Sequence, residues 1–489
     1  MEILDKTAVR TRFAPSPTGF LHVGSLRTAL YSYLFAKKHD GQFLLRIEDT
    51  DQSREIPGGT QAIIDALLWA GLPFDEGPGK EGSCGPYIQS QCLPRYQEHA
   101  KKLVDAGHAY YCFCSPERLE EVRARQLAAH VPTGYDRHCR DLSAQEVSQL
   151  LADNTPHVIR MKLPLTGQLT FLDLIRGEVS IAWHVLDDQV LLKTDGFPTY
   201  HLAAVVDDHF MQISHVIRGE EWLPSTPKHL LLYQYFGWQA PLFAHLPLLL
   251  NPDRSKLSKR QGDVAVEDYR AKGYLPQAMV NFIALLGWNP GDTQEFFTLD
   301  ELVKQFGLER VGKSGSVFDI QKLNWLNQHY ISRMSAQELL PYVKPLLIAH
   351  GWGSFPDDYI CRIIDLTKDR SVVIPDFVEL NPFFFEAPVN FDRDLVVKIS
   401  TPTVLPVLKE LCKKYHELPE FTAAIAEHVL RSYAQELSIS AGKLLQPLRI
   451  AITGMTQGPS LFHTMEILGK DESLKRFDFA IAAFEKIVS

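Results

Sequence analysis

The hydrophobic pattern near the N-terminus predicts a strand, a turn and a helix in succession. Val9 to Phe13 can form a short buried strand, and prolines and glycines follow it. A helix beginning at Gly24-Ser25 would direct free backbone N–H groups and a positive dipole end at the preceding turn. The pattern therefore predicts an anion site, with phosphate as its usual occupant. The helical face consists of Leu26, Ala29, Leu30, Tyr33 and Leu34.

A second strand and an acidic segment follow this helix. The spacing Gly19-x4-Gly24-Ser25 suggests a P-loop, but Ser25 stands where that motif requires lysine. Phe43 to Ile47 is a predicted buried strand, and Glu48-Asp-Thr-Asp51 lies at its carboxyl end. A strand–helix–strand unit of this size is parallel, with ligands over the carboxyl ends of its strands. We expect the opening turn and the acidic segment to be neighbours; the alternative for the acidic segment is a solvated turn.

The next part of the chain changes from helical to β-rich patterning. Helical patterns cover Gly59 to Trp69, Pro94 to Ala106 and Glu117 to His130, and a strand is predicted at Ala109 to Cys114. Four strand patterns come next, and we interpret them as an insertion in the sheet: His157 to Leu163, Leu169 to Leu174, Val179 to Val185 and Gln189 to Leu192.

The main sheet is predicted to resume at Tyr200 to Asp208 and at Ile213 to Arg218, because these apolar runs suit strands buried on both faces. A strand at Leu246 to Leu250 ends in a polar loop. This loop contains Lys256-Leu-Ser-Lys-Arg260, with three cations in five residues, which can be a solvated turn or a phosphate-binding loop. Beyond Trp325 the pattern is almost entirely helical.

Composition limits the class of protein. A chain of 489 residues is too long to fold around a single hydrophobic core, so several domains are expected. Its composition, with 45% apolar and 22% charged residues, is typical of globular domains. No apolar run of about eighteen residues predicts a membrane span, and the N-terminus lacks signal-peptide features. Seven sparse cysteines suit a reducing, cytoplasmic location. A net charge of −9 argues mildly against nucleic acid, although a basic face can exist within an acidic total.

Two segments, taken together, resemble the paired signatures of class I aminoacyl-tRNA synthetases. Pro15-Ser-Pro-Thr-Gly-Phe-Leu-His-Val-Gly-Ser25 resembles the HIGH signature, and Lys256-Leu-Ser-Lys-Arg260 resembles the KMSKS loop. The ordered set resembles the bacterial type of glutamyl-tRNA synthetase over nearly the whole chain. The other segments that carry this resemblance are Arg46–Asp51, Val206–His209, Ile217–Trp222, Gly442–Arg449 and Gly458-Pro459.

The resemblance implies an architecture of an α/β Rossmann-type parallel-sheet catalytic domain with an α+β insertion, followed by an all-α C-terminal half. The expected domains are a catalytic domain at 1–90 and 200–255, an acceptor-arm-binding insertion at 91–199, a linking domain at 256–330 and a helical anticodon-binding region at 331–489.

It also implies a two-step reaction. Glutamate attacks the α-phosphorus of ATP to give glutamyl-adenylate, and a hydroxyl of the terminal tRNA adenosine then attacks the adenylate. Because the first nucleophile is already a carboxylate, positioning and charge stabilisation supply the rate. Mg²⁺ accompanies ATP. The implied catalytic residues are His22, Lys256 and Lys259, and the implied ATP-binding residues are Thr18, His22, Gly24 and Lys259.

The implied glutamate site must bind two carboxylates and one ammonium. By resemblance, Arg12 binds the side-chain carboxylate, because a planar guanidinium offers a bidentate match. Arg218 is a second cationic contact, Glu48 pairs with the ammonium, and Ser16 and Tyr200 supply hydroxyls. The alternatives are a structural ion pair for Arg12 and a core position for Tyr200. The chain departs from some relatives at Ala204, where they carry an amide side chain.

The cysteines of the insertion suggest a metal site. Some relatives bind zinc with the pattern of Cys112, Cys114 and Cys139, and with histidine at the position of Asp141. Aspartate can bind zinc, so these four residues are the candidate ligands, with His138 as a substitute; the alternative is three reduced thiols.

The predicted function is therefore that of a glutamate–tRNA ligase with tRNA(Glu) and L-glutamate as partners, no membrane, and a monomer as the default state. One alternative is a non-discriminating enzyme that also charges tRNA(Gln). Two further alternatives are a glutaminyl enzyme, which usually has a different opening motif, and the short paralogue that modifies a tRNA base, which lacks the C-terminal half present here. An alternative of another class is a catalytically silent tRNA-binding relative, against which His22, Gly24, Lys256 and Lys259 argue.

Overall fold

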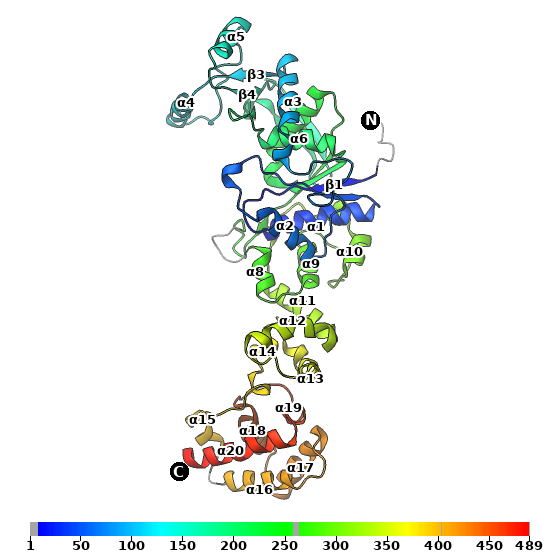
Figure 1. Ribbon diagram of the computed structural model, residues 1–489, viewed down its shortest axis with the longest axis vertical. Helices are drawn as coiled ribbons and strands as arrows, with labels where there is room; N and C mark the ends of the chain where they lie inside the picture. Colours follow the sequence, from blue (N-terminus) through cyan, green and yellow to red (C-terminus); the bar gives the residue numbers. More distant parts are fainter. Residues whose placement is uncertain (1–7, 258–263, 402, 489) are drawn as a thin grey trace. The chain divides into compact units, whose positions relative to one another are not determined.

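A computed structural model describes residues 8–257, 264–401 and 403–488 (Figure 1). The chain divides into two compact units: Met1–Arg270 with Pro276–Ile320, and Ala271–Leu275 with Gln321–Ser489. None of the described helices is long and apolar enough to cross a membrane.

The first unit is organised around a six-stranded sheet with the order β2-β1-β8-β9-β5-β6. All neighbouring strands are parallel except β5 and β6, which form an antiparallel hairpin at one edge. The predicted parallel strand–helix–strand unit is confirmed, since β1 and β2 pair in parallel on either side of helix α1 in the sequence. The strands are β1 Arg10–Phe13, β2 Gln42–Leu45, β5 Gln168–Asp173, β6 Gly177–Ala182, β8 His215–Gly219 and β9 Leu242–Leu246.

Helices cover both faces of this sheet. Figure 1 shows α1 (Val23–Lys38) and α6 (Tyr200–Phe210) on opposite sides of β1. Apolar residues of α6 pack with those of α7 (Thr226–Phe236) and with Val216 and Phe243 of the sheet in one buried cluster. Burial of such a cluster between two layers is the main stabilisation of an α/β unit.

The predicted strand at Tyr200 to Asp208 is wrong, because these residues lie in helix α6. All seven residues from Leu202 to Asp208 are buried. A helix that is buried on every side shows no 3.6-residue alternation, and its apolar run therefore has the same pattern as a buried strand.

The four strand patterns of the predicted insertion divide between two sheets. Two of them, β4 (Val158–Met161) and β7 (Val190–Leu192), join β3 (Ala109–Cys112) in a separate antiparallel sheet. The other two are β5 and β6, and they extend the main sheet, where β5 pairs with β9. Strand periodicity shows which face of a strand is buried, but it does not show which sheet the strand joins. The domain boundaries stay predictions.

The first unit also contains a separate two-stranded parallel sheet, formed by β10 (Leu249–Leu250) and β11 (Ser316–Val317). Its remaining helices are short or of moderate length. The helices are α2 Gly59–Trp69, α3 Leu93–Asp105, α4 Pro116–Ala128, α5 Ala144–Ala152, α8 Val266–Ala271, α9 Pro276–Ala284 and α10 Leu299–Gln305.

The described secondary structure of the second unit consists of helices joined by turns, with no strand, which confirms the all-α prediction for the C-terminal half. A large apolar cluster is shared by the helices from α15 to α20. The helices are α11 Ile320–Arg333, α12 Ala336–Ala349, α13 Asp357–Thr367, α14 Asp376–Glu379, α15 Arg393–Ile399, α16 Leu405–His416, α17 Ala423–Glu436, α18 Gly442–Thr453, α19 Leu461–Leu468 and α20 Lys470–Val488.

Candidate active site

A cavity of about 700 Å³ lies at the carboxyl ends of β1 and β8. The turn after β1 and the acidic segment after β2 both border it, and the backbone N–H of Glu48 donates to the carbonyl of Pro15 at 2.9 Å. The prediction that these two segments are neighbours is confirmed. The cavity is lined by six residues that sequence analysis selected: Arg12, Ser16, Thr18, Glu48, Tyr200 and Arg218.

A second cavity, of about 260 Å³, contains the other described candidates, His22, Gly24 and Lys256. Both cavities are lined by Ser25, Thr28, Gly219 and Glu221, so they adjoin. The structure thus distributes the predicted glutamate and ATP residues over two neighbouring spaces, with Thr18 on the glutamate side. Lys259 lies outside the described residues.

The start of α1 differs from the prediction. The helix begins at Val23, and His22 is its N-cap, with its Nδ1 accepting a hydrogen bond of 2.9 Å from the Gly24 N–H. The N–H of Val23 donates to the carbonyl of Val264, and that of Ser25 to the carbonyl of His22. The expected free N–H groups at Gly24-Ser25 are therefore already bonded. Any phosphate here must rely on side chains and on the helix dipole.

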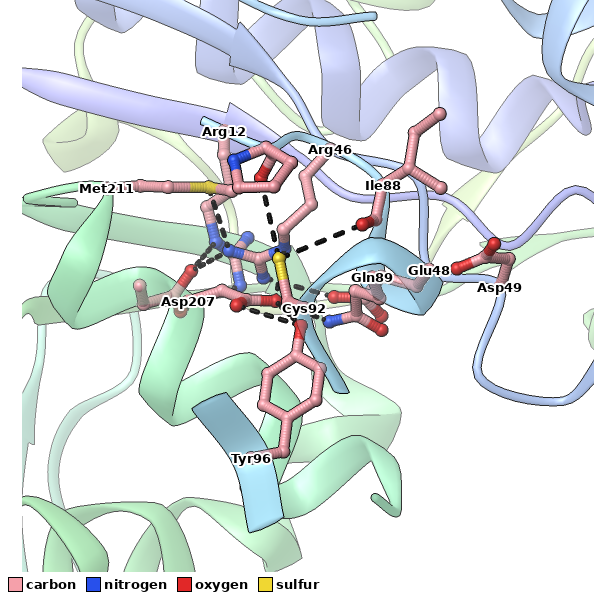
Figure 2. A network of polar contacts seen from close by, with 12 residues as sticks. Arg12, Arg46, Glu48, Asp49, Ile88, Gln89, Cys92, Tyr96, Asp207 and Met211 are labelled. Carbon is pink, nitrogen blue, oxygen red and sulfur yellow. Dashed lines mark hydrogen bonds and ion pairs between the residues drawn. The ribbon is translucent and has the colours of Figure 1, made fainter. Parts of the chain in front are cut away.

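A network of buried charges supports the larger cavity (Figure 2). Arg12 donates from Nε and Nη2 to the two carboxylate oxygens of Asp208, at 3.0 and 3.4 Å. Arg46 donates to Asp208 at 2.6 Å and to Glu48 at 3.0 Å, so Asp208 lies between two guanidinium groups. Burial raises the pKa of Glu48 although Arg46 opposes this effect. For Asp208, the two arginines outweigh burial and lower the pKa of the carboxyl.

The remaining carboxylate of this network is Asp207, which Arg46 approaches at 3.8 Å. Figure 2 shows Gln89 and Tyr96 directed at Asp207, to which they donate hydrogen bonds of 2.8 Å and 2.8–2.9 Å. Paired, hydrogen-bonded charges of this kind hold their side chains in one geometry. The network therefore fixes Arg12 at the cavity wall. Two of its five N–H donors are used, and the other three have no partner among the described residues.

Arg218 is bonded in a different way. Its five N–H groups donate to five acceptors, none of which is a carboxylate: His245 Nε2 at 3.0 Å, Tyr200 Oη at 3.1 Å, His229 Nδ1 at 3.1 Å, Trp222 O at 3.3 Å and Thr226 Oγ1 at 2.9 Å. Tyr200 also packs on Trp222, with 4.2 Å between ring centroids. The Tyr200 hydroxyl accepts from Arg218, so its own proton is available to a ligand.

The candidate metal ligands are gathered in part. The thiols of Cys112, Cys114 and Cys139 lie within 4.8 Å of one another. Asp141 is exposed and does not belong to this group. Instead the Tyr135 hydroxyl lies 3.2 Å from the Cys112 sulfur and 3.6 Å from that of Cys114. All seven cysteines are free thiols.

Sequence reasoning assigned no role to Asp208, His229 or His245. Asp208 lies in a segment that carried the resemblance, and the strand prediction for that segment concealed which residues face inward. The two histidines had no local signal, because each becomes relevant through contact with a residue 11 or 27 positions away.

The comparisons with known proteins agree with this geometry. Residues 8–325 match the family model described as "tRNA synthetases class I (E and Q), catalytic domain", and residues 336–481 match an anticodon binding domain. A curated glutamate–tRNA ligase from Chlorobium chlorochromatii is 49% identical, covering 96% of this chain and 97% of its own. The chain belongs to the glutamate–tRNA ligase family of class I aminoacyl-tRNA synthetases.

Other members of the family show similar levels of sequence or structural similarity to this chain. The ligase of Clostridioides difficile is 48% identical over 96% of this chain and 98% of its own length. A crystal structure of a glutamate tRNA ligase from Elizabethkingia meningosepticum, in complex with its amino acid, matches with a TM-score of 0.92 and 40% identity. The match covers 98% of this chain and all of the other. The Rossmann-type fold class and the family assignment from sequence are thereby confirmed, and class membership implies the use of ATP.

Proposed function

We propose that the larger cavity binds L-glutamate and that the smaller one binds the phosphates of ATP. The observation that carries this assignment is Arg12, a guanidinium held by Asp208 with three N–H donors left at the wall of the larger cavity. A planar cation of this kind matches the side-chain carboxylate of glutamate. The adjoining cavity carries the cations and the N-cap that suit a polyphosphate.

In the first step, an α-carboxylate oxygen of glutamate attacks the α-phosphorus of ATP. The bond from that phosphorus to the bridging oxygen breaks, and pyrophosphate leaves with the electron pair. No proton has to be removed from the nucleophile, so placing the two reactants across the shared wall of Ser25, Thr28 and Gly219 supplies much of the rate. His22 and Lys256, with Lys259 by resemblance, stabilise the phosphate charge.

Two assignments complete the glutamate site as predictions. Glu48 binds the substrate ammonium, and this contact competes with the 3.0 Å ion pair between Glu48 and Arg46. Ser16 and Tyr200, which both line the cavity, supply hydroxyl groups. Mg²⁺ enters as the counter-ion of ATP, and Glu221 is the carboxylate that lines both described cavities and can contribute an oxygen ligand.

The thiol cluster fits a structural zinc ion. Three cysteine sulfurs and one further oxygen make a tetrahedral donor set, and Tyr135 is the oxygen donor that the fold brings to them. We therefore assign Cys112, Cys114, Cys139 and Tyr135 as ligands in place of the set with Asp141. Metal analysis checks this assignment: Tyr135→Phe should lower the zinc content of the purified protein, and Asp141→Asn should leave it unchanged.

The partners of the reaction are tRNA(Glu) and L-glutamate, with the cytoplasm as the place of action and a monomer as the working state. Free thiols throughout the chain support a reducing compartment. Aminoacylation of purified tRNA(Glu) and tRNA(Gln) distinguishes a discriminating enzyme from one that charges both.

Pyrophosphate exchange with glutamate, ATP and added tRNA tests the enzymatic function. Exchange is expected, and none under any tRNA condition would favour a silent tRNA-binding relative. Lys259→Ala should reduce turnover far more than tRNA affinity; an unchanged turnover would contradict the role given to Lys259.

A further inference from the structure

Arg218 is a buried cation that neutral groups surround in the part of the chain that the structure describes. Only 5% of the residue is exposed, and its five N–H groups donate to two imidazole nitrogens, two hydroxyl oxygens and one carbonyl oxygen. Among the described residues, no carboxylate pairs with it. Arg12, which is 4% exposed, shares Asp208 with Arg46. A buried charge without a counter-ion is costly, so an arrangement that keeps one requires a reason.

The hydrogen bonds determine the state of the two histidines. The Nδ1 of His229 accepts from Arg218, and its other nitrogen must therefore carry the proton and donate to His201 Nδ1 at 3.0 Å. His245 Nε2 accepts from Arg218 in the same way, and Nδ1 donates to Asp173 at 2.6 Å. Both rings are acceptors towards Arg218 only while they are neutral.

The environment favours the neutral rings. Burial, followed by repulsion from Arg218 and His201, holds the pKa of His229 far below its usual value. Burial also lowers the pKa of His245, although its bond to Asp173 opposes this. Asp173 is the nearest carboxylate along the chain of bonds, and a complete imidazole ring separates it from the guanidinium.

We infer that His229 is a specificity-determining positioning residue for the amino-acid substrate. It holds Arg218 in place through an uncharged acceptor, and so it leaves the Arg218 charge to be neutralised by the side-chain carboxylate of the substrate, the same group that is assigned to Arg12. A neutral side chain, such as the amide of glutamine, cannot supply that charge. This inference rests on the proposed glutamate site. It gives His229, which does not line the cavity, a part in selecting an anionic side chain, in addition to Arg12 and Arg218, which do line it.

The test uses two nearly isosteric variants of the full chain, His229→Gln and His229→Glu. The amide keeps a neutral acceptor, and the carboxylate adds a counter-ion beside Arg218. Titration calorimetry should show that His229→Gln changes the Kd for glutamate by no more than about threefold. His229→Glu should raise it by about tenfold or more and leave the Kd for ATP unchanged.

Discrimination provides a readout that a purely structural role would not move. In pyrophosphate exchange, the ratio of kcat/KM for glutamate to that for glutamine should fall about tenfold or more in His229→Glu relative to His229→Gln. Equal ratios and equal glutamate affinities in the two folded variants would overturn the inference. If the unaltered chain bound no glutamate, the proposed function itself would fail, and the two failures are thus distinguishable.

A second matched pair keeps the test decisive if the His229 variants do not fold. Thr226 begins α7 and accepts from Arg218 Nη2, and helix N-termini accommodate both amide and acidic side chains. Thr226→Asp should weaken glutamate binding relative to Thr226→Asn by about tenfold, for the same reason. Equal affinities in this pair would also overturn the inference.

Discussion

The two sides of the larger cavity hold their arginines in different ways. On the side of β1, Arg12 and Arg46 share the carboxylate of Asp208, and Arg46 also pairs with Glu48 and Asp207. On the side of β8, Arg218 is surrounded by neutral nitrogen and oxygen acceptors. The first arrangement stabilises the protein and orients the Arg12 guanidinium. The second leaves the positive charge of Arg218 without a counter-ion from these neighbours, so that an anionic ligand can neutralise it. Guanidinium groups at one cavity can therefore have separate functions, and the difference lies in their partners.

The largest effect on stability is expected at Asp208. Asp208→Asn would leave Arg12 and Arg46 without the carboxylate that they share, and breaking a buried pair in this way costs about 3–5 kcal/mol. Urea denaturation that follows the first unit measures the loss. The matched control is Asp49→Asn, because Asp49 is also buried but accepts only the backbone N–H of Ser90 among the described residues. Similar losses in both variants would contradict the charge-sharing account.

A smaller loss is expected when Arg218 is removed. Arg218→Met leaves neutral acceptors without donors, and hydroxyl groups and imidazole rings can reorient, so we expect a loss of about 1–3 kcal/mol. Arg46→Met leaves Glu48 and Asp207 without their ionic partner and Asp208 with Arg12 alone, and it should cost about 3–5 kcal/mol. The same urea denaturation experiment compares the free energies of unfolding of the Arg218→Met and Arg46→Met proteins. An Arg218→Met protein less stable than Arg46→Met would show that the two sides do not differ as described.

The smallest effect is a change in pH dependence at His201. Burial, with repulsion from Lys228 and Arg218, lowers the pKa of His201 to about 4, whereas an unfolded histidine titrates at about 6.5. Between these pH values the unfolded chain binds a proton that the folded chain does not, so the free energy of unfolding falls as pH falls from about 6.5 to about 4. His201→Gln should make this slope shallower by about one proton. Denaturation at several pH values measures it, and parallel slopes would contradict a neutral His201 behind His229.

One feature of the site, the proximity of its two segments, could be predicted from local sequence. The strand before the opening turn, the helix after it and the next strand are contiguous in the chain, and the handedness of the chain makes the two strands parallel. The carboxyl ends of the two strands therefore lie side by side, which predicts that the opening turn and the acidic segment are neighbours. The pairing of the His22 and Lys256 segments came from resemblance, and the structure places both residues at one cavity. The expectation of a free N–H at Gly24 was wrong, because the N-cap residue His22 accepts its hydrogen bond, and the anion site itself stays a prediction.

The sequence by itself therefore determined the β1–α1–β2 unit, the helical C-terminal half and the family, because each depends on local periodicity or on short motifs. The tertiary structure decided which sheet β5 and β6 join, that α6 is a helix, and that Tyr135 rather than Asp141 lies beside the thiols. It also decided that Arg12 has an anionic partner, whereas Arg218 has none within residues 8–257, 264–401 and 403–488. The physical reason is that burial and pairing depend on contacts between distant segments, such as Arg12 with Asp208, which no local pattern records.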